Sequence, residues 1–311
     1  MLNRGPMNSK VLHIGFDDTD SYSGRCTTNL AFKITSKLTS ELDSVFIDYP
    51  LLVRLNPNIP WKTRGNGGMC LRIRTSQPSQ IIEYLTKIVR AESDIQNGAN
   101  PGLAIFESDT IPLSLRQFSA KALYDVLKIE DAEKLASQLS IHIFKYGAGL
   151  GIIGALASIG ALLEGDHTYE AIAYRKEVFQ GSPRKIDKSK VSKVSIDTHP
   201  FTFNNFDRIH DRVLITPHGP DPVFCGIRGE NPFTVIRALY YVLPIEKLEG
   251  YMVFRTNQGT NMHLQNALSL SNIATHNAGY LRCTVTKKPR TIRGGHVLFE
   301  VSDCSNIKYP V

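Results

Sequence analysis

The chain has 311 residues, of which 42% are hydrophobic and 21% charged, so it has the composition of an ordinary globular protein with room for two or three domains. Lysine and arginine number 36 against 29 aspartates and glutamates, which gives a formal net charge of +7. This modest excess favours a polyanionic partner such as RNA. The five cysteines are odd in number and form no C-x-x-C pair, which excludes an encoded disulfide framework or zinc ribbon.

The sequence offers no membrane segment. Residues 1–10 are polar and lack the apolar core of a signal peptide. The longest apolar run, at residues 148–163, is too short and too rich in glycine to span a bilayer. We therefore expect a cytoplasmic protein with no membrane partner.

An acidic loop follows the first predicted strand, at residues 11–16, and carries Asp17, Asp18 and Asp20. These carboxylates repel one another without a cation, which makes Mg²⁺ and the phosphates of a nucleotide natural companions. A turn without chemistry explains the loop on its own equally simply, because aspartate and serine favour turns for local hydrogen-bonding reasons.

The segment after the acidic loop is predicted to be a helix, because Leu30, Ile34 and Leu38 recur every four residues. Thr27 lies near its start, where it could cap the helix or receive a phosphate group.

A basic, glycine-rich loop follows a long predicted strand at residues 45–55 and precedes another strand at residues 69–74. It contains the residues Lys62, Arg64, Gly65, Asn66 and Gly67. Exposed N–H groups and two cations can close together on phosphate oxygens, although a flexible hairpin loop with solvated charges is the alternative. Trp61, just before the loop, is either a core anchor or a platform on which a base stacks.

The middle of the chain alternates a helix at residues 81–89, a strand at 102–107 and helices at 114–127 and 132–139, which favours α/β packing. Gly149, Gly151 and Gly154 then spell G-x-G-x-x-G between a predicted strand and an apolar helix. The acidic residue that a dinucleotide site requires about 20 positions later is not clearly placed. We therefore interpret the glycines first as allowing close packing or phosphate approach, and second as an NAD site.

The second half contains a polar, basic segment at residues 175–195 that resembles a domain junction. Strands at 212–216 and 223–228, a helix capped by Asn231 and a strand at 251–256 follow in a β-β-α-β order, which suits a ferredoxin-like half or a small α+β domain. Asp221 could take part in acid-base chemistry, or could belong to a rigid proline-rich turn.

The last part of the chain is predicted to hold strands at residues 281–287 and 296–301 around a basic turn. Such a pair could begin an OB-type barrel that binds single-stranded nucleic acid. Only about three strands fit before the sequence stops, whereas the barrel needs five, so we expect a partial barrel.

Several long strings, in order, resemble the archaeal tRNA-isoleucine agmatidine synthase (2-agmatinylcytidine synthetase) family. They are IGFDDTDS at residues 14–21, Gly24 with CTT at 26–28, RLNPNIPWKTRGNG at 54–67, PHGPDPV at 217–223, GIRGE at 226–230 and FRTNQGT at 254–260. The resemblance runs from about residue 11 to at least residue 301.

The resemblance implies three domains: a kinase-like, ATP-binding α/β catalytic domain at 1–175, a ferredoxin-like α+β domain at 176–248 and a partial OB-fold at 249–311. Typical members also carry a C-terminal zinc ribbon. This sequence has no cysteine quartet after the OB region, so we expect it to lack that ribbon.

The implied activity is an ATP-dependent ligation. With ATP and Mg²⁺, members activate the C2 carbonyl of the wobble cytidine in an isoleucine tRNA with a CAU anticodon, through a phosphorylated intermediate, and then join agmatine there. The alternatives left open are a non-catalytic RNA-binding module, an inactive truncated synthetase and an NAD enzyme.

The resemblance also assigns roles to residues. Thr27 occupies the family's phosphorylated position; the carboxylates of the acidic loop would hold Mg²⁺, and Lys62 and Arg64 would neutralise the transferring phosphate. The remaining candidates are Gly65, Asn66, Gly67, Gly149 and Gly151 for the nucleotide, and Asp221, Arg228, Arg255 and Asn257 for the substrates.

Overall fold

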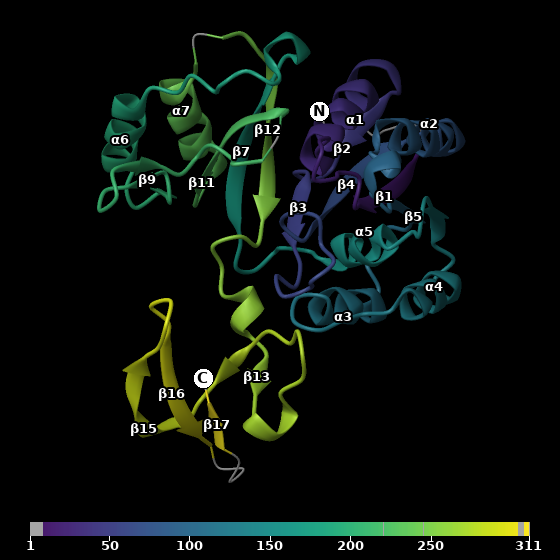
Figure 1. Cartoon of the computed structure of the whole chain (residues 1–311). Coiled ribbons are helices and arrows are strands. Elements are labelled where there is room, and N and C mark those ends of the chain that lie inside the picture. The colour runs from purple at the N-terminus through teal and green to yellow at the C-terminus, as the bar shows by residue number, and fades with distance from the viewer. Residues whose placement is uncertain (1–8, 220, 245, 304–307, 311) are drawn as a thin grey trace.

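Figure 1 shows the computed structural model of the chain, which describes residues 9–219, 221–244, 246–303 and 308–310. Its main feature is a ten-stranded sheet with the strand order β6-β5-β1-β4-β3-β12-β7-β11-β8, in which β2 also pairs with β4. Neighbouring strands along this order are antiparallel, except that β3 and β12 are parallel. The large sheet is therefore mixed.

The strands of this sheet have the bounds β1 Lys10–Asp17, β2 Ser44–Phe46, β3 Leu51–Arg54, β4 Gly67–Thr75, β5 Gly102–Glu107, β6 His142–Lys145, β7 Thr168–Arg175, β8 Thr202–Phe203, β11 Val223–Gly229 and β12 Leu248–Thr256. The helices are α1 Thr27–Glu41, α2 Pro78–Glu92, α3 Leu113–Lys121, α4 Ile129–Gln138, α5 Gly151–Gly160, α6 Lys188–Asp197 and α7 Pro232–Val242. Short 3₁₀ helices lie at Ile95–Asn97, Glu177–Phe179, Met262–Leu264 and Leu270–Asn272.

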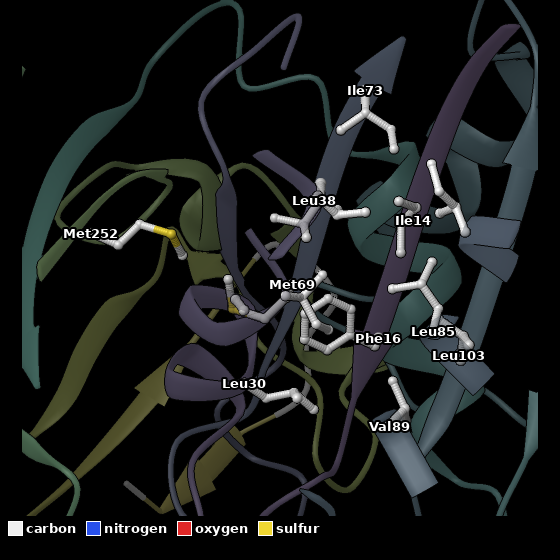
Figure 2. Close-up of a cluster of buried hydrophobic side chains, with 14 of the residues drawn as sticks. Ile14, Phe16, Leu30, Leu38, Met69, Ile73, Leu85, Val89, Leu103 and Met252 are labelled. Carbon is white, nitrogen blue, oxygen red and sulfur yellow. The ribbon is translucent and has the colours of Figure 1, made fainter. Parts of the chain in front are cut away.

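Two apolar layers enclose the N-terminal half of the sheet. The apolar faces of α1 and α2 pack on one side of β1, β4 and β5, in the cluster drawn in Figure 2. Helix α5, with α3 and α4, packs on the other side. The predicted amphipathic periodicity of α1 is confirmed, because Leu30, Ile34 and Leu38 are all buried there.

The second half of the sheet has its own core. Strands β11 and β12 flank β7 on either side and are both antiparallel to it, so they are parallel to each other and joined by α7. Helices α6 and α7 share a buried cluster with these strands. Asn231 caps α7 as predicted, because its side chain accepts a hydrogen bond of 2.8 Å from the Thr234 N–H.

The sheet crosses both predicted domain boundaries. Strand β7 ends at residue 175 and β12 begins at residue 248, and these two strands pair along most of their length. The positions of the domain boundaries, after residues 175 and 248, therefore stay predictions.

The C-terminal strands lie apart from the large sheet in Figure 1. Strands β13 (Ala267–Leu268) and β14 (Tyr280–Leu281) form a parallel pair, and β15 (Thr284–Thr291), β16 (Val297–Ser302) and β17 (Lys308–Pro310) form an antiparallel sheet. A further two-strand sheet joins β9 (Phe206–Asp207) to β10 (Arg212–Val213). The predicted pair of strands around a basic turn is confirmed as β15 and β16.

Two predicted elements were too long. The strand expected at residues 45–55 is broken between β2 and β3, where Pro50 has no N–H to donate and Asp48 turns its carboxylate toward Arg72 at 3.2 Å. The helix expected at 114–127 ends at residue 121. Beyond it, the carbonyl oxygens of Ala122 and Asp125 accept hydrogen bonds from the backbone and side chain of Asn56.

The predicted junction at residues 175–195 is also more ordered than its composition indicates. It contains the 3₁₀ helix Glu177–Phe179 and the start of α6, whose N-cap Asp187 accepts hydrogen bonds from the next turn. Local capping therefore organises a segment that has few apolar residues.

Candidate active site

The acidic loop begins where β1 ends. Asp17 is the last residue of the strand, and its Oδ1 accepts a 2.6 Å hydrogen bond from the Asp18 N–H. Asp18 adopts a left-handed backbone conformation with φ of 57°, which residues other than glycine rarely take. Backbone strain of this kind is concentrated at functional sites.

The surroundings of the first two carboxyl groups of the loop, those of Asp17 and Asp18, raise their pKa values. Burial, with repulsion from Asp18, raises the pKa of Asp17 to about 8. Burial, with repulsion from Asp20, raises the pKa of Asp18 to about 6, although the Asn100 N–H (3.2 Å) and the Thr63 hydroxyl (3.4 Å) donate to it. Burial is the larger cause for both carboxyls, and a cation beside them would favour their charged forms.

The third carboxylate is already paired. Arg64 Nε donates to Asp20 Oδ2 at 2.7 Å, and Arg64 also donates to the Arg25 carbonyl at 2.6 Å. The basic loop and the acidic loop therefore meet through Arg64 and Asp20. Within the described residues, no three acidic, histidine or cysteine side chains gather into a group that could hold a metal ion. A metal held by Asp17, Asp18 and Asp20 together stays a prediction.

Thr27 lies in the same cluster. Its hydroxyl is buried, accepts a 3.0 Å hydrogen bond from Thr19 and donates over 3.4 Å to Asp20 Oδ1. Thr27 is the first residue of α1, and the N-cap position belongs to Cys26, so the proposal that Thr27 caps the helix is wrong. Its hydroxyl is instead directed into the acidic cluster.

One cavity, which we call cavity A, opens on the side of the basic loop. Its lining combines carboxylates, the basic loop, apolar side chains and the start of α5: Asp17, Asp18, Asp20, Leu55, Ile59, Trp61, Lys62, Thr63, Gly65, Asn66, Gly67, Ala122, Asp125, Leu127, Leu150, Gly151, Ile153 and Gly154. A lining that combines charged and apolar side chains suits a nucleotide, which has both charged phosphates and an aromatic base.

Two residues of the basic segment point elsewhere than expected. Lys62 donates to the carbonyl oxygens of Pro57 at 2.5 Å and Ile59 at 3.3 Å, so its ammonium group orders the loop. Trp61 is 58% exposed at the cavity rim, with its ring edge-on to His276, so it is not a core anchor. A stacking role for Trp61 stays a prediction.

The glycines of the G-x-G-x-x-G run bring α5 onto the end of β1. A Cβ atom at Gly154 would lie 1.9 Å from Asp17 Oδ2, and one at Gly151 would lie 2.4 Å from the Asp17 carbonyl oxygen. Gly149 packs against Lys145, away from the cavity lining. The preceding strand, β6, is antiparallel to β5, so this is not the parallel βαβ unit of a dinucleotide site, and close packing is the interpretation that fits.

A second cavity, cavity B, lies on the other side of Asp17 and Asp20. Its lining is Asp17, Asp20, Cys26, Thr27, Thr28, Leu52, Arg54, Arg64, Gly65, Gly67, Glu170, Ile172, Leu214, Ile215, Thr216, Pro217, Val223, Gly226 and Arg228. Glu170 projects from the middle of β7, accepting from Arg228 Nε at 3.2 Å and lying 3.8 Å from Arg54 Nη2. Of the residues predicted to bind substrate, Arg228 is the one that lines this cavity.

Asp221 is engaged in a different network. Its carboxylate accepts from the buried Arg175 at 3.0 Å and from the Gly181 N–H at 2.7 Å, and it pairs with Arg184 at 3.5 Å. It lines another cavity together with Glu249.

Arg255 and Asn257 hold the two halves of the sheet together. Arg255 pairs with Asp48, and the Asn257 amide bonds to both the N–H (2.7 Å) and the carbonyl (2.9 Å) of Arg54. Substrate contact by Asp221, Arg255 or Asn257 stays a prediction, because none of them lines cavity A or cavity B in the described part of the chain.

Glu170 and Arg54 were missed as site residues by sequence reasoning. The available signal was a glutamate within the largely apolar strand 168–175, since a buried charge needs partners. Those partners are far along the sequence: Arg54 lies on β3 and Arg228 on β11. Only the strand order brings them together.

No described helix is long and apolar enough to cross a membrane.

Family models match two parts of the chain, the TiaS TCKD domain at residues 13–77 and the TiaS FLD domain at residues 149–263. The chain is similar to the isoleucine-tRNA 2-agmatinylcytidine synthetase TiaS of Methanosarcina acetivorans, with 41% identity over 298 residues that cover 93% of this chain and 69% of the relative. The enzyme of the same name from Cenarchaeum symbiosum is 40% identical over 291 residues, covering 94% of this chain and 64% of the relative.

The fold is also similar to a solved complex of TiaS with its isoleucine tRNA, AMPCPP and agmatine. The TM-score is 0.86 and the identity 33%, over 94% of this chain and 71% of that one. The chain thus spans about two thirds of the length of the proteins it resembles.

Proposed function

The chain belongs to the TiaS family, and we propose from this that it is an ATP-dependent ligase that joins agmatine to the wobble cytidine of an isoleucine tRNA with a CAU anticodon. The observation that carries the proposal is the meeting of the family's acidic and basic strings at one site, through Arg64 and Asp20. The relatives' names and the bound tRNA, ATP analogue and agmatine of the related complex support the same activity.

We further propose that the N-terminal part is a kinase-like, ATP-binding unit. Asp17 and Asp18 lie at the carboxyl end of β1, next to the first turn of α5, and Thr27, the first residue of α1, lies beside Asp20 of the same loop. The part around β7 is proposed as a ferredoxin-like unit, supported by the split β-α-β arrangement of β11, α7 and β12. The last strands form a partial OB-type unit in this proposal.

ATP is proposed to occupy cavity A. Residues of the basic loop and of the first turn of α5 line this cavity, and helix N-termini carry a partial positive charge that attracts phosphate groups. Mg²⁺ fits beside Asp17 and Asp18, because a cation would offset the burial and the repulsion that raise their pKa values, and Mg²⁺ commonly binds one or two carboxylates and completes its shell with phosphates and water. Bound there, it would neutralise phosphate charge; Asp20 stays with Arg64.

Thr27 is proposed as the phosphorylated residue. Its hydroxyl lies beside Asp20, a residue that lines both cavity A and cavity B, and Arg64 is positioned to stabilise charge on a phosphate group there. Activation of the cytosine carbonyl is chemically required, because its oxygen is a poor leaving group until it carries a phosphoryl group. The agmatine amine can then displace phosphate at C2.

We place the reaction in the cytoplasm.

The test is incorporation of labelled agmatine into the isoleucine tRNA by this chain with ATP and Mg²⁺. We expect Asp18→Asn to reduce incorporation by roughly 100-fold or more, because it removes a charge that the nucleotide site needs. Asp197→Asn, at the exposed end of α6, is the matched control and should behave as wild type. Equal incorporation by wild type and Asp18→Asn would overturn the assignment of the site.

A further inference from the structure

Asn56 is a buried polar residue that joins segments far apart in the sequence. It is only 1% exposed. Its carbonyl oxygen accepts from the Asn66 side chain at 2.8 Å, and its N–H donates to the Ala122 carbonyl oxygen at 2.9 Å. Its side-chain NH₂ donates to the carbonyl oxygens of Asp125, at 3.2 Å, and His276, at 2.8 Å. Losing one of these partners would leave a buried polar group unsatisfied, so the joined segments favour staying together.

All but one of these partners line cavity A. The exception, His276, belongs to residues 274–278, which we call the rim turn. A 3.2 Å hydrogen bond from the Asn277 N–H to the Ala274 carbonyl oxygen closes this turn. His276 has a left-handed backbone with φ of 68°, which is costly for a residue other than glycine and persists where neighbouring contacts hold it. The shape of the rim turn therefore depends on contacts such as the hydrogen bond from Asn56.

Further hydrogen bonds fasten the rim turn to the same wall of cavity A. Asn58 donates to the Asn277 carbonyl oxygen at 2.9 Å, and the Ala278 N–H donates to the Tyr124 carbonyl oxygen at 2.9 Å. The Asn277 side chain donates to Asp125 Oδ1 at 3.3 Å. Asn58 is exposed, and the other residues of these bonds are half-buried, so water competes for them. Bonds of this kind open more easily than those of a core.

The rim turn also contacts Trp61, the only tryptophan of the chain. The rings of Trp61 and His276 are edge-on, with their centroids 6.2 Å apart. Trp61 itself lines cavity A. The position of the rim turn is therefore felt directly at this cavity, and the fluorescence of one residue can report it.

The rim turn leads into the C-terminal strands. Strand β14 begins at Tyr280, and β15, an exposed strand with basic side chains, begins at Thr284. The segment before the turn is tied to the same strands, because the Leu270 N–H donates to the Asp303 carboxylate, just after β16, at 2.7 Å. Exposed cations on these strands suit a phosphate backbone. A tRNA bound there is connected to cavity A through the rim turn.

Building on the proposed function, we propose that Asn56 is a positioning residue that couples the C-terminal strands to the nucleotide site. Bound tRNA holds the rim turn against the wall of cavity A, and ATP then binds more tightly because the cost of ordering that wall has already been met. A coupling between two binding sites is reciprocal, so ATP strengthens tRNA binding by the same factor. The nucleotide is thus held most firmly when the tRNA that it activates is present.

The test compares the Kd of a non-hydrolysable ATP analogue with Mg²⁺ in the absence and in the presence of saturating isoleucine tRNA, at one fixed salt concentration. Calorimetry gives both values, and the emission of Trp61 gives a second readout of each titration. We call the Kd without tRNA divided by the Kd with tRNA the coupling ratio. A merely structural role of Asn56 would weaken analogue binding equally in both conditions and leave this ratio unchanged.

We expect a coupling ratio of about 5 or more in wild type and of less than about 2 in Asn56→Ala. Asn272→Ala, an exposed asparagine shortly before the rim turn, is the matched control and should keep the wild-type ratio. Equal ratios in wild type and Asn56→Ala would overturn the inference. So would a wild-type ratio near 1, or an analogue that does not bind.

A second variant covers the case in which Asn56→Ala does not fold. Asn58→Ala combined with His276→Ala removes two surface contacts of the rim turn and leaves the buried Asn56 in place. We expect this double variant to lower the coupling ratio at least about 2-fold, and an unchanged ratio contradicts the inference.

Agmatine incorporation by wild type is measured separately. If the coupling ratio depends on the contacts of the rim turn but no agmatine is incorporated, the proposed activity fails and the coupling stands. If agmatine is incorporated and the ratio is independent of those contacts, the activity stands and the coupling fails.

Discussion

At the scale of single residues, Thr27 adjoins the acidic loop that the two cavities share. It is buried, it lies within hydrogen-bonding distance of Thr19 and Asp20, and it belongs to the lining of cavity B. Its hydroxyl thus lies beside Asp20, which lines both cavities. We therefore expect the hydroxyl group of Thr27, rather than the volume of its side chain, to matter for activity.

Thr27→Ala should lower agmatine incorporation by roughly 100-fold or more, because it removes the hydroxyl that is proposed to carry the phosphoryl group. Thr27→Ser keeps a hydroxyl at the same atom position and should retain most of the activity. Thr39→Ala, on the exposed side of the same helix, controls for the loss of a threonine from α1. If Thr27→Ala worked as fast as wild type in single-turnover measurements, phosphoryl transfer through Thr27 would be excluded.

The protonation of His13, a buried residue of β1, affects the stability of the fold. Arg72 Nε donates to His13 Nδ1 at 3.2 Å, which leaves the proton on Nε2, facing the Ser108 carbonyl at 2.9 Å. Burial, together with the charge of Arg72, lowers the pKa of His13 from 6.5 to about 4. The folded protein thus keeps this imidazole neutral in a pH range where the unfolded chain protonates it.

The contribution of His13 to the free energy of unfolding should consequently fall by about 2 kcal/mol between pH 7 and pH 5, whereas Asp17 and Asp18, whose pKa values are raised, act in the opposite sense. The contribution of His13 is complete above its unfolded pKa, because the unfolded state binds the extra proton only below it. Urea unfolding of wild type and His13→Gln at both pH values isolates this loss, because the carboxylates contribute to both proteins. From pH 7 to pH 5, His13→Gln should gain stability relative to wild type by about 2 kcal/mol, whereas the exposed His142→Gln should keep the wild-type slope. Identical slopes for wild type and His13→Gln would refute the role of His13.

At the scale of elements, helix α5 positions the acidic loop. It lies across β1, β4 and β5, and its glycines allow its backbone to touch the end of β1. A glycine-rich helix is poorly stable alone, so its conformation depends on this packing. The G-x-G-x-x-G run thus shapes the site through the position of Asp17.

Gly154→Ala is expected to destabilise the fold by about 1–3 kcal/mol, since the new methyl group would overlap the Asp17 carboxylate. The same displacement should reduce nucleotide binding, measured by titration with an ATP analogue. Gly165→Ala is the control, because no atom lies within 4 Å of the position of its added Cβ. Wild-type stability and nucleotide affinity in Gly154→Ala would show that α5 does not constrain the acidic loop.

Local sequence patterns predict much of this architecture and little of cavity B. The strand before Asp17, the amphipathic α1 and the capped α7 follow from periodicity and capping, which act over a few residues. The contact between Arg64 and Asp20 was not predicted, because the resemblance assigned Arg64 to the transferring phosphate and Asp20 to Mg²⁺. Glu170 could not be predicted, because its arginine partners depend on the placement of β7 between β12 and β11. Strand order is set by long-range packing and leaves no local signal.

At the scale of the whole molecule, the exposed cations of the last strands offer a surface that can bind tRNA. The hairpin of β15 and β16 exposes Lys288, Arg290 and Arg293, and every residue of β15 is exposed. Cations on such a surface can follow a phosphate backbone. They would contribute to tRNA affinity without entering the chemistry.

Replacing Lys288, Arg290 and Arg293 together by alanine should weaken tRNA binding and reduce the slope of log affinity against log salt concentration by about 2, because fewer counterions are released. Agmatine incorporation at saturating tRNA should stay near wild type. Lys87→Ala, on α2, removes a cation that is paired with Glu83 and should leave the slope unchanged. An unaltered slope in the triple variant would place the tRNA on another surface.

The central claim is that this chain completes an ATP-dependent ligation on one nucleoside of its tRNA. The most direct measurement is mass spectrometry of nucleosides from isoleucine tRNA incubated with the chain, ATP, Mg²⁺ and agmatine. The account predicts that the wobble cytidine gains one agmatine with loss of water, only when ATP is present, and that other cytidines are unchanged. A tRNA that binds the chain with ATP and agmatine present, yet keeps an unmodified wobble cytidine, would contradict it.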